Sequence, residues 1–201
     1  MNKEILIKEL KSQGISKKIL ESIKAIDREK FVPEEYKEMA YNNIALPLGE
    51  ASTISQPYTL AFMLDMLDLK KDSKQKVLEI GSGSGYSLAL INNITKGKTY
   101  GIEINKRVAL NSKKNLEKNK DIKVFIKSGI KGLPEETPFD RILISASASE
   151  IPLHLLNQLE KDGIIVSSVR TSIYKIKKTE KGPEIEEYPG FVFVPLQDSE
   201  K

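Results

Sequence analysis

Three glycines alternate with serines directly after a short apolar run, in residues 77–86, VLEIGSGSGY. Val77, Leu78 and Ile80 favour a buried strand, which ends where Gly81 introduces turn and helix signals. Glycines remove the side chains that keep a ligand away from the backbone, and the first turn of a helix presents free amide groups. Such amides suit a carboxylate or a ribose edge. The pattern therefore predicts a strand, a ligand-binding loop and a helix.

Two acidic residues accompany this loop. Glu79 stands two residues before the first glycine, and Glu103 closes the run TYGIE, where the end of the next strand places an acid against ribose hydroxyls. The glycines are spaced G-x-G-x-G, whereas the dinucleotide fingerprint is G-x-G-x-x-G. Taken alone, the glycine motif also fits an ordinary flexible turn, and Glu103 alone also fits a solvated acid at a strand end. Together they predict S-adenosylmethionine as cofactor, bound by Glu79, Gly81, Ser82, Gly83, Gly85 and Glu103.

The composition excludes several kinds of chemistry. The chain has 201 residues, no cysteine and one histidine, so we expect no disulfide, no thiolate metal site and no Cys or His nucleophilic pair. We expect no bound metal. His154 lies in EIPLHLLNQL, where apolar residues share a helical face, and this spacing favours a structural role for it.

Charge and hydropathy bear on partners and location. The net charge is +4, but lysines are spread along the chain, so we expect no nucleic-acid partner. The amino terminus, MNKEILIKEL, lacks the apolar core of a signal peptide, and no stretch approaches a membrane span. We therefore expect a cytoplasmic protein that does not engage a membrane, and the even spread of charge suggests a monomer.

Apolar periodicity outlines the fold. Helices are predicted over residues 3–12 and 17–25 and from Pro57, separated by an irregular stretch of loop and short strands. From residue 76 onward, strands and helices alternate. Strands are predicted to end at residues 80 and 104 and to span 122–127, 139–145 and 164–166. Helices are predicted to begin at residues 85, 106 and 152. Such alternation predicts an α/β, doubly wound, Rossmann-like and mostly parallel sheet, with an antiparallel strand pair near the carboxyl end. We expect one domain over 1–201, with an N-terminal helical cap in 1–75 and the cofactor-binding sheet in 76–201.

Several segments together resemble the protein-L-isoaspartate O-methyltransferase family. They are residues 40–64, which contain TISQP at 53–57, then 77–86, 137–152 and FVPL at 193–196. The glycine motif is common to many methyltransferases, whereas TISQP is specific to this family. The resemblance begins at DREKFVP, residues 27–33, and so covers nearly the whole chain.

The resemblance implies methyl transfer from S-adenosylmethionine to the α-carboxyl of L-isoaspartyl residues in damaged proteins and peptides. The ester then collapses to a succinimide, which starts repair. A carboxylate is ionised well below neutral pH and is already a nucleophile, so this chemistry needs no general base. The site must instead align the reacting atoms and remove water from the carboxylate.

The resemblance also assigns roles to the TISQP segment (residues 53–57). Ser55 is placed at the active site, where its hydroxyl would donate a hydrogen bond that orients the substrate carboxylate. Thr53 and Ile54 would contact the cofactor opposite the glycine loop. An alternative for Ser55 is that it caps the helix that begins at Pro57, and both roles can hold together.

Three departures from the family pattern bear on affinity and substrate choice. Lys127, Ser128 and Gly129 replace the usual Gly-Asp-Gly, so a hydroxyl stands where an acid would meet adenine. Ser168, Val169 and Arg170 replace Pro-Val-Gly near the peptide, where an arginine would clash or bind a carboxylate bidentately. Ala51 and Ser52 replace Gly-Gln.

Three functions follow as hypotheses. The favoured one is an isoaspartyl carboxyl methyltransferase with an altered cofactor pocket. The second is a methyltransferase acting on another peptide or small-molecule carboxylate, which Arg170 makes possible. The third is a binding module that holds cofactor or peptide weakly without catalysis. Cofactor affinity separates the third from the other two.

Overall fold

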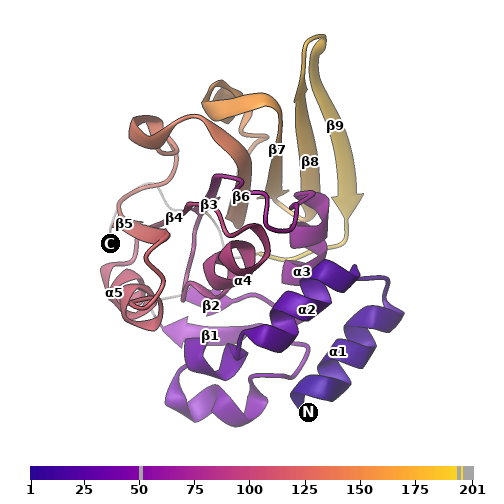
Figure 1. Ribbon diagram of the computed structural model, residues 1–201, viewed down its shortest axis with the longest axis vertical. Coiled ribbons are helices and arrows are strands. Elements are labelled where there is room, and N and C mark those ends of the chain that lie inside the picture. Colours follow the sequence, from indigo (N-terminus) through magenta and orange to yellow (C-terminus); the bar gives the residue numbers. More distant parts are fainter. Residues whose placement is uncertain (50–51, 194–195, 197–201) are drawn as a thin grey trace.

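The computed structural model describes residues 1–49, 52–193 and 196, and a twisted sheet lies at its centre (Figure 1). The sheet has seven strands in the order β5-β4-β3-β6-β7-β8-β9. Strands β3 to β7 are parallel, and β8 is antiparallel to both of its neighbours. This confirms the predicted Rossmann-like fold with antiparallel strands near the carboxyl end. The strands are β3 (Val77–Ile80), β4 (Thr99–Glu103), β5 (Ile122–Ile126), β6 (Phe139–Ala148), β7 (Leu159–Val169), β8 (Ser172–Thr179) and β9 (Gly182–Pro189).

Helices cover one face of the sheet. Their apolar sides form one buried cluster with Val77 of β3, Leu143 of β6 and Ile164 of β7. Helix α2 lies between α1 and α4 and also contacts α3, which makes the N-terminal cap part of this layer (Figure 1). Helix α5 packs on β4 and β5. The helices are α1 (Lys3–Ser12), α2 (Lys17–Ala25), α3 (Pro57–Met66), α4 (Tyr86–Thr95) and α5 (Lys106–Asn115).

Short 3-10 helices cover the other face, where Leu78 and Ile80 point. The predicted helix from Pro152 was wrong, because the chain forms only the 3-10 helix η4 (Leu153–Gln158) before β7 begins. The side chain of Gln158 accepts from Leu133 N at 2.9 Å and donates to the Lys131 carbonyl at 2.7 Å. These bonds fix η4 beside η3 (Pro134–Glu136) and end it after six residues.

The irregular stretch before the sheet forms short elements that lead to α3. The 3-10 helices η1 (Arg28–Phe31) and η2 (Glu34–Met39) come first. Strand β1 (Leu46–Gly49) then pairs with β2 (Ser52–Ile54) in a separate two-stranded sheet. Ala51, one of the family departures, lies outside the described residues.

The hairpin of β8 and β9 projects beyond the rest of the sheet (Figure 1). Its lysines face acidic partners: Lys175 lies 3.5 Å from Glu186, and Lys177 stands opposite Glu184. Lys178 donates to the Leu159 carbonyl at 2.7 Å. The positive charge of these lysines is therefore offset by acidic residues of β9, and Lys178 bonds to main chain. Within the described ranges, no helix has both the length and the apolar character needed to cross a membrane.

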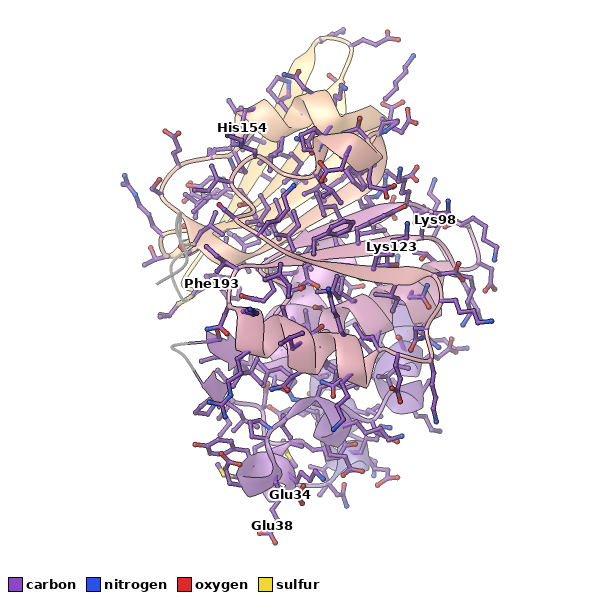
Figure 2. The ribbon with its side chains drawn as sticks, turned by 90° about the vertical axis from the view of Figure 1, so that its left-hand side faces the viewer. Glu34, Glu38, Lys98, Lys123, His154 and Phe193 are labelled. Carbon is purple, nitrogen blue, oxygen red and sulfur yellow. The ribbon has the colours of Figure 1, made fainter. Side chains whose placement is uncertain are left out.

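The side chain of Asp65 joins α3 to the start of α2. Asp65 accepts a hydrogen bond from Ser16 N at 2.8 Å and a second one from the Ser16 hydroxyl. We expect Asp65→Ala to lower the free energy of unfolding by about 1–3 kcal/mol, since it leaves the Ser16 amide without its partner. Urea unfolding measures the change. The control is Glu38→Ala, because Glu38 projects into solvent (Figure 2) and should leave the midpoint unchanged. Equal midpoints for both variants would contradict the prediction.

Candidate active site

A cavity of about 790 Å³ opens at the carboxyl ends of β3, β4 and β6. The loop after β3 and Glu103 form one wall, and the TISQP segment with the start of α3 forms the opposite wall. Phe193 lies on this side of the molecule, whereas Lys98 and Lys123, at the starts of β4 and β5, lie on the other side (Figure 2). The cavity therefore occupies the ligand position that the predicted sheet implied.

The glycine loop needs its glycines for two different reasons. Gly83 lines the cavity with a φ of 52°, which L side chains rarely adopt, and its amide donates to Glu103 Oε2 at 2.9 Å. Gly85 lies outside the cavity lining, and a Cβ there would come within 2.5 Å of Ser112 Oγ and 2.6 Å of Leu116 Cδ1. Gly83 thus brings backbone to the ligand space, and Gly85 lets the loop pack on α5.

Glu103 holds its carboxylate at the cavity edge. It is the last residue of β4 and is 6% exposed. Besides the bond from Gly83, its Oε1 accepts from Asn105 N at 2.9 Å. Two backbone amides therefore orient the carboxylate while each oxygen keeps a further lone pair. This arrangement suits hydroxyl donors such as a ribose diol.

Glu79 is buried behind the wall rather than on it. Its side chain is 1% exposed and outside the cavity lining. The hydroxyl of Ser87 lies 2.6 and 2.5 Å from its two oxygens, and the hydroxyl of Ser145 donates to Oε1 at 2.7 Å. Burial raises the pKa of Glu79 to about 7, although both serine hydrogen bonds oppose that shift. Since Ser145 does line the cavity, Glu79 acts on that space through Ser145.

The TISQP segment presents polar groups from the opposite wall. Thr53 and Ser55 line the cavity, whereas Ile54 points into the hydrophobic core. Helix α3 is capped at Gln56 without a side-chain hydrogen bond, so the helix-cap alternative for Ser55 was wrong. Within the described part of the chain, the Ser55 hydroxyl has no hydrogen-bond partner. It is therefore free to bond a ligand.

The remaining predicted residues divide between two cavities. Gly129 lines both the first cavity and a neighbouring one of about 560 Å³, and Arg170 lines only the second. Ser128 lines neither; its hydroxyl accepts a long bond from Ile130 N at 3.5 Å. Val169 is buried beneath the exposed Arg170, and Ser82 is buried with its hydroxyl unpartnered among the described residues.

Two groups of site residues were missed by sequence reasoning. The first is the segment after β9, where Phe193 and Leu196 line both cavities and Leu196 N donates to the Ser147 carbonyl at 2.8 Å. The FVPL motif contributed to the resemblance without a role; its Val194 and Pro195 lie outside the described residues. The second is Asn43, whose side chain accepts from Tyr58 N at 3.0 Å at the start of α3. Its position in an irregular stretch gave no periodic signal.

His154 lies apart from any group of acidic residues that could complete a metal centre in the described part of the chain. His154 is exposed at the rim of the second cavity, where its Nε2 lies 2.8 Å from the Ile130 carbonyl oxygen. Throughout the described ranges, no three His, Asp or Glu side chains gather in a way that could hold a metal ion.

Known proteins resemble this chain from end to end. A family model described as protein-L-isoaspartate(D-aspartate) O-methyltransferase matches residues 1–201. The protein-L-isoaspartate O-methyltransferase of Dictyoglomus turgidum is 40% identical over 199 residues, which cover 96% of this chain and 89% of that protein. The enzyme of the same name from Ignicoccus hospitalis is 35% identical over 209 residues, which cover 98% of each.

Solved structures agree in fold. One protein-L-isoaspartate O-methyltransferase superposes with a TM-score of 0.89 at 26% identity, covering 99% of this chain and 67% of the other. A structure from Plasmodium falciparum, in complex with S-adenosyl-L-homocysteine, gives a TM-score of 0.85 at 24% identity and covers 98% of this chain and 99% of its own. The second likeness supports the fold alone.

The raised pKa of Glu79 predicts how stability depends on pH. Between its usual value of 4.5 and its native value of about 7, the folded protein keeps a proton that the unfolded chain releases. This contribution to stability is complete below the lower value and is lost as pH rises toward the higher one, at up to about 1.4 kcal/mol per pH unit. We expect Glu79→Gln to flatten this decline between pH 5 and 7 in urea unfolding. Glu38→Gln is the control, and parallel curves for wild type and Glu79→Gln would contradict the prediction.

Proposed function

The chain belongs to the protein-L-isoaspartate(D-aspartate) O-methyltransferase family, and from this premise we propose that its first cavity holds both cofactor and substrate carboxylate. The enzyme transfers a methyl group from S-adenosylmethionine to the α-carboxyl of L-isoaspartyl residues in damaged proteins and peptides, and so initiates repair through a succinimide. The observation that carries the proposal is that Ser55, whose hydroxyl has no hydrogen-bond partner in the described residues, lines the same cavity as the glycine loop and Glu103.

The residues of the first wall fit a nucleoside cofactor. The oriented carboxylate of Glu103 would accept hydrogen bonds from ribose hydroxyls, and the open backbone at Gly81 and Gly83 would take the amino-acid end. S-adenosylmethionine supplies an electrophilic methyl group when bound. Around these contacts, Ser82, Gly85 and Glu79 support the loop, Gly129 lines the cavity on the adenine side, and Thr53 lines the facing wall, whereas Ser128 and Ile54 lie outside the lining.

Ser55 would hold the substrate carboxylate in line for transfer. Its hydroxyl donates one hydrogen bond, which fixes one carboxylate oxygen and leaves the other to react. No general base is needed, because the carboxylate is ionised at neutral pH. Phe191, Phe193 and Leu196 border the cavity with apolar surface that reduces the water around the carboxylate.

The substrate side would extend toward Val169 and Arg170. Arg170 stands at the second cavity with a φ of 52°, and its Nε donates a weak bond to the Ser149 carbonyl at 3.3 Å. The guanidinium keeps further donors for a carboxylate of the bound peptide. The same feature supports the alternative, methylation of another peptide or small-molecule carboxylate. We also propose that the enzyme acts in the cytoplasm as a monomeric single domain, without nucleic-acid or membrane partners.

Labelled methyl transfer to a matched peptide pair tests the proposal. The peptides are identical except that one carries an L-isoaspartyl residue and the other a normal L-aspartyl residue. We expect label on the isoaspartyl peptide only, because only that linkage places its α-carboxyl at the Ser55 hydroxyl. If the protein binds S-adenosyl-L-homocysteine but labels neither peptide, the substrate is a different carboxylate. If it binds neither cofactor nor peptide, the proposal is wrong.

Replacing Ser55 tests the role of its hydroxyl. We expect Ser55→Ala to lower kcat by about 10- to 100-fold, which corresponds to one hydrogen bond to a charged group. Binding of S-adenosyl-L-homocysteine, measured by calorimetry, is the internal control and should stay unchanged. Turnover equal to wild type would leave Ser55 as a wall residue without a part in the reaction.

A further inference from the structure

A buried arginine lies behind the TISQP segment, outside both cavities. Arg28 of η1 is 0% exposed. Its Nη2 donates to the Ser55 carbonyl and its Nε to the Ala40 carbonyl, each at 2.9 Å. The guanidinium also lies 5.3 Å from the ring centroid of Tyr86. Its Nη1 has no hydrogen-bond partner in the ranges that the structure describes.

The cation has no carboxylate partner among the described residues. Burial lowers the pKa of Arg28 to about 10, which still leaves it protonated at neutral pH. Burying an unpaired charge costs several kcal/mol, and apolar residues of similar volume often stabilise such sites as well or better. Arg28 is therefore poorly explained as a residue that serves stability alone.

The contacts of Arg28 join the two walls of the active site. Ser55 belongs to the wall that faces the substrate carboxylate, and Tyr86 is the first residue of α4, directly after the glycine loop. Across the described residues, the hairpin of β1 and β2 shares no strand pairing with the main sheet. Contacts other than strand pairing therefore set its position against the glycine loop, and Arg28 supplies one of them by bonding the carbonyl of Ser55, directly after β2, while it lies against the Tyr86 ring.

We propose that Arg28 is a positioning residue, which fixes the Ser55 main chain against the start of α4 and thereby sets the Ser55 hydroxyl for the substrate carboxylate. This inference rests on the proposed function. Arginine suits the task because its planar fork donates to two carbonyls in fixed directions while its face stacks on an aromatic ring. Lysine keeps the charge but cannot reproduce that geometry.

A double-mutant cycle between Arg28→Lys and Ser55→Ala tests the inference. We expect Arg28→Lys to lower kcat/KM for the isoaspartyl peptide by about 10- to 100-fold, the cost of misplacing a reacting group by about 1 Å. In the Ser55→Ala background the same change should cost less than about twofold, because residues that act through one another are not additive. A merely structural arginine would give the same loss in both backgrounds.

Arg141 provides a matched control. It is 7% exposed at the start of β6, and it donates to the Leu67 carbonyl at 2.6 Å and to the Asp140 carbonyl at 2.8 Å. We expect Arg141→Lys to lower thermal stability without changing kcat/KM below the melting temperature. If Arg28→Lys fails to fold, Arg28→Gln, which keeps a planar donor and removes the charge, enters the same cycle.

The outcomes separate this inference from the proposed function. Additive losses, or an equal loss from Arg141→Lys, in an enzyme that methylates the isoaspartyl peptide would overturn the role of Arg28 alone. A wild-type protein that does not methylate the isoaspartyl peptide would overturn the proposed function and this inference with it.

Discussion

The site depends on how closely the glycine loop approaches the end of β4. The carbonyl of Ile102 accepts two amides, from Gly81 at 2.9 Å and from Ser82 at 3.0 Å, which turns the chain sharply after β3. This approach also requires Gly101, because a Cβ there would lie 2.6 Å from Leu88 Cδ1 and 2.8 Å from Ser82 Oγ. Once the loop is held there, the Gly83 amide reaches Glu103, α4 begins on the helical face of the sheet, and the cavity opens beside them.

Charge around the cavity is arranged in layers. Glu103 lies at the cavity edge, where backbone amides orient it and solvent still reaches it. Glu79 lies deeper, so burial favours its neutral form, and the Ser145 hydroxyl stands between it and the ligand space. Arg28 lies behind the facing wall. Glu79 and Arg28 are thus kept off the cavity lining, whereas Glu103 lies at its edge together with small polar groups. S-adenosylmethionine carries a positive sulfonium, and the substrate carries a negative carboxylate. A strong charge of either sign beside them would attract one group and repel the other, so a weak electrostatic field suits the binding of both.

Much of this arrangement could be predicted from the sequence, because its signals are local. Period-2 and period-3.6 patterns predicted the strands and the main helices, and the glycine spacing with Glu103 predicted residues that the structure brings together at one cavity. The helix predicted from Pro152 was wrong because the spacing of Leu155 and Leu159 fits a helical face and a turn into a strand equally well. The hydrogen bonds of Gln158 to Leu133 and Lys131, far away in the sequence, favour the turn. Arg28, Asn43 and Leu196 were missed for the same reason. Each acts through a backbone group far along the chain, and no spacing within a sequence window reports such a contact.

The two walls differ in how firmly they are built, and this difference bears on function. Main-sheet hydrogen bonds run directly into the wall formed by the glycine loop and Glu103. In the described residues β1 and β2 pair only with each other, and side chains such as Arg28 and Asn43 hold the segment that follows them, at Ser55 and Tyr58. A ligand that touches both walls adds contacts that the free protein lacks, so binding stabilises their relative position.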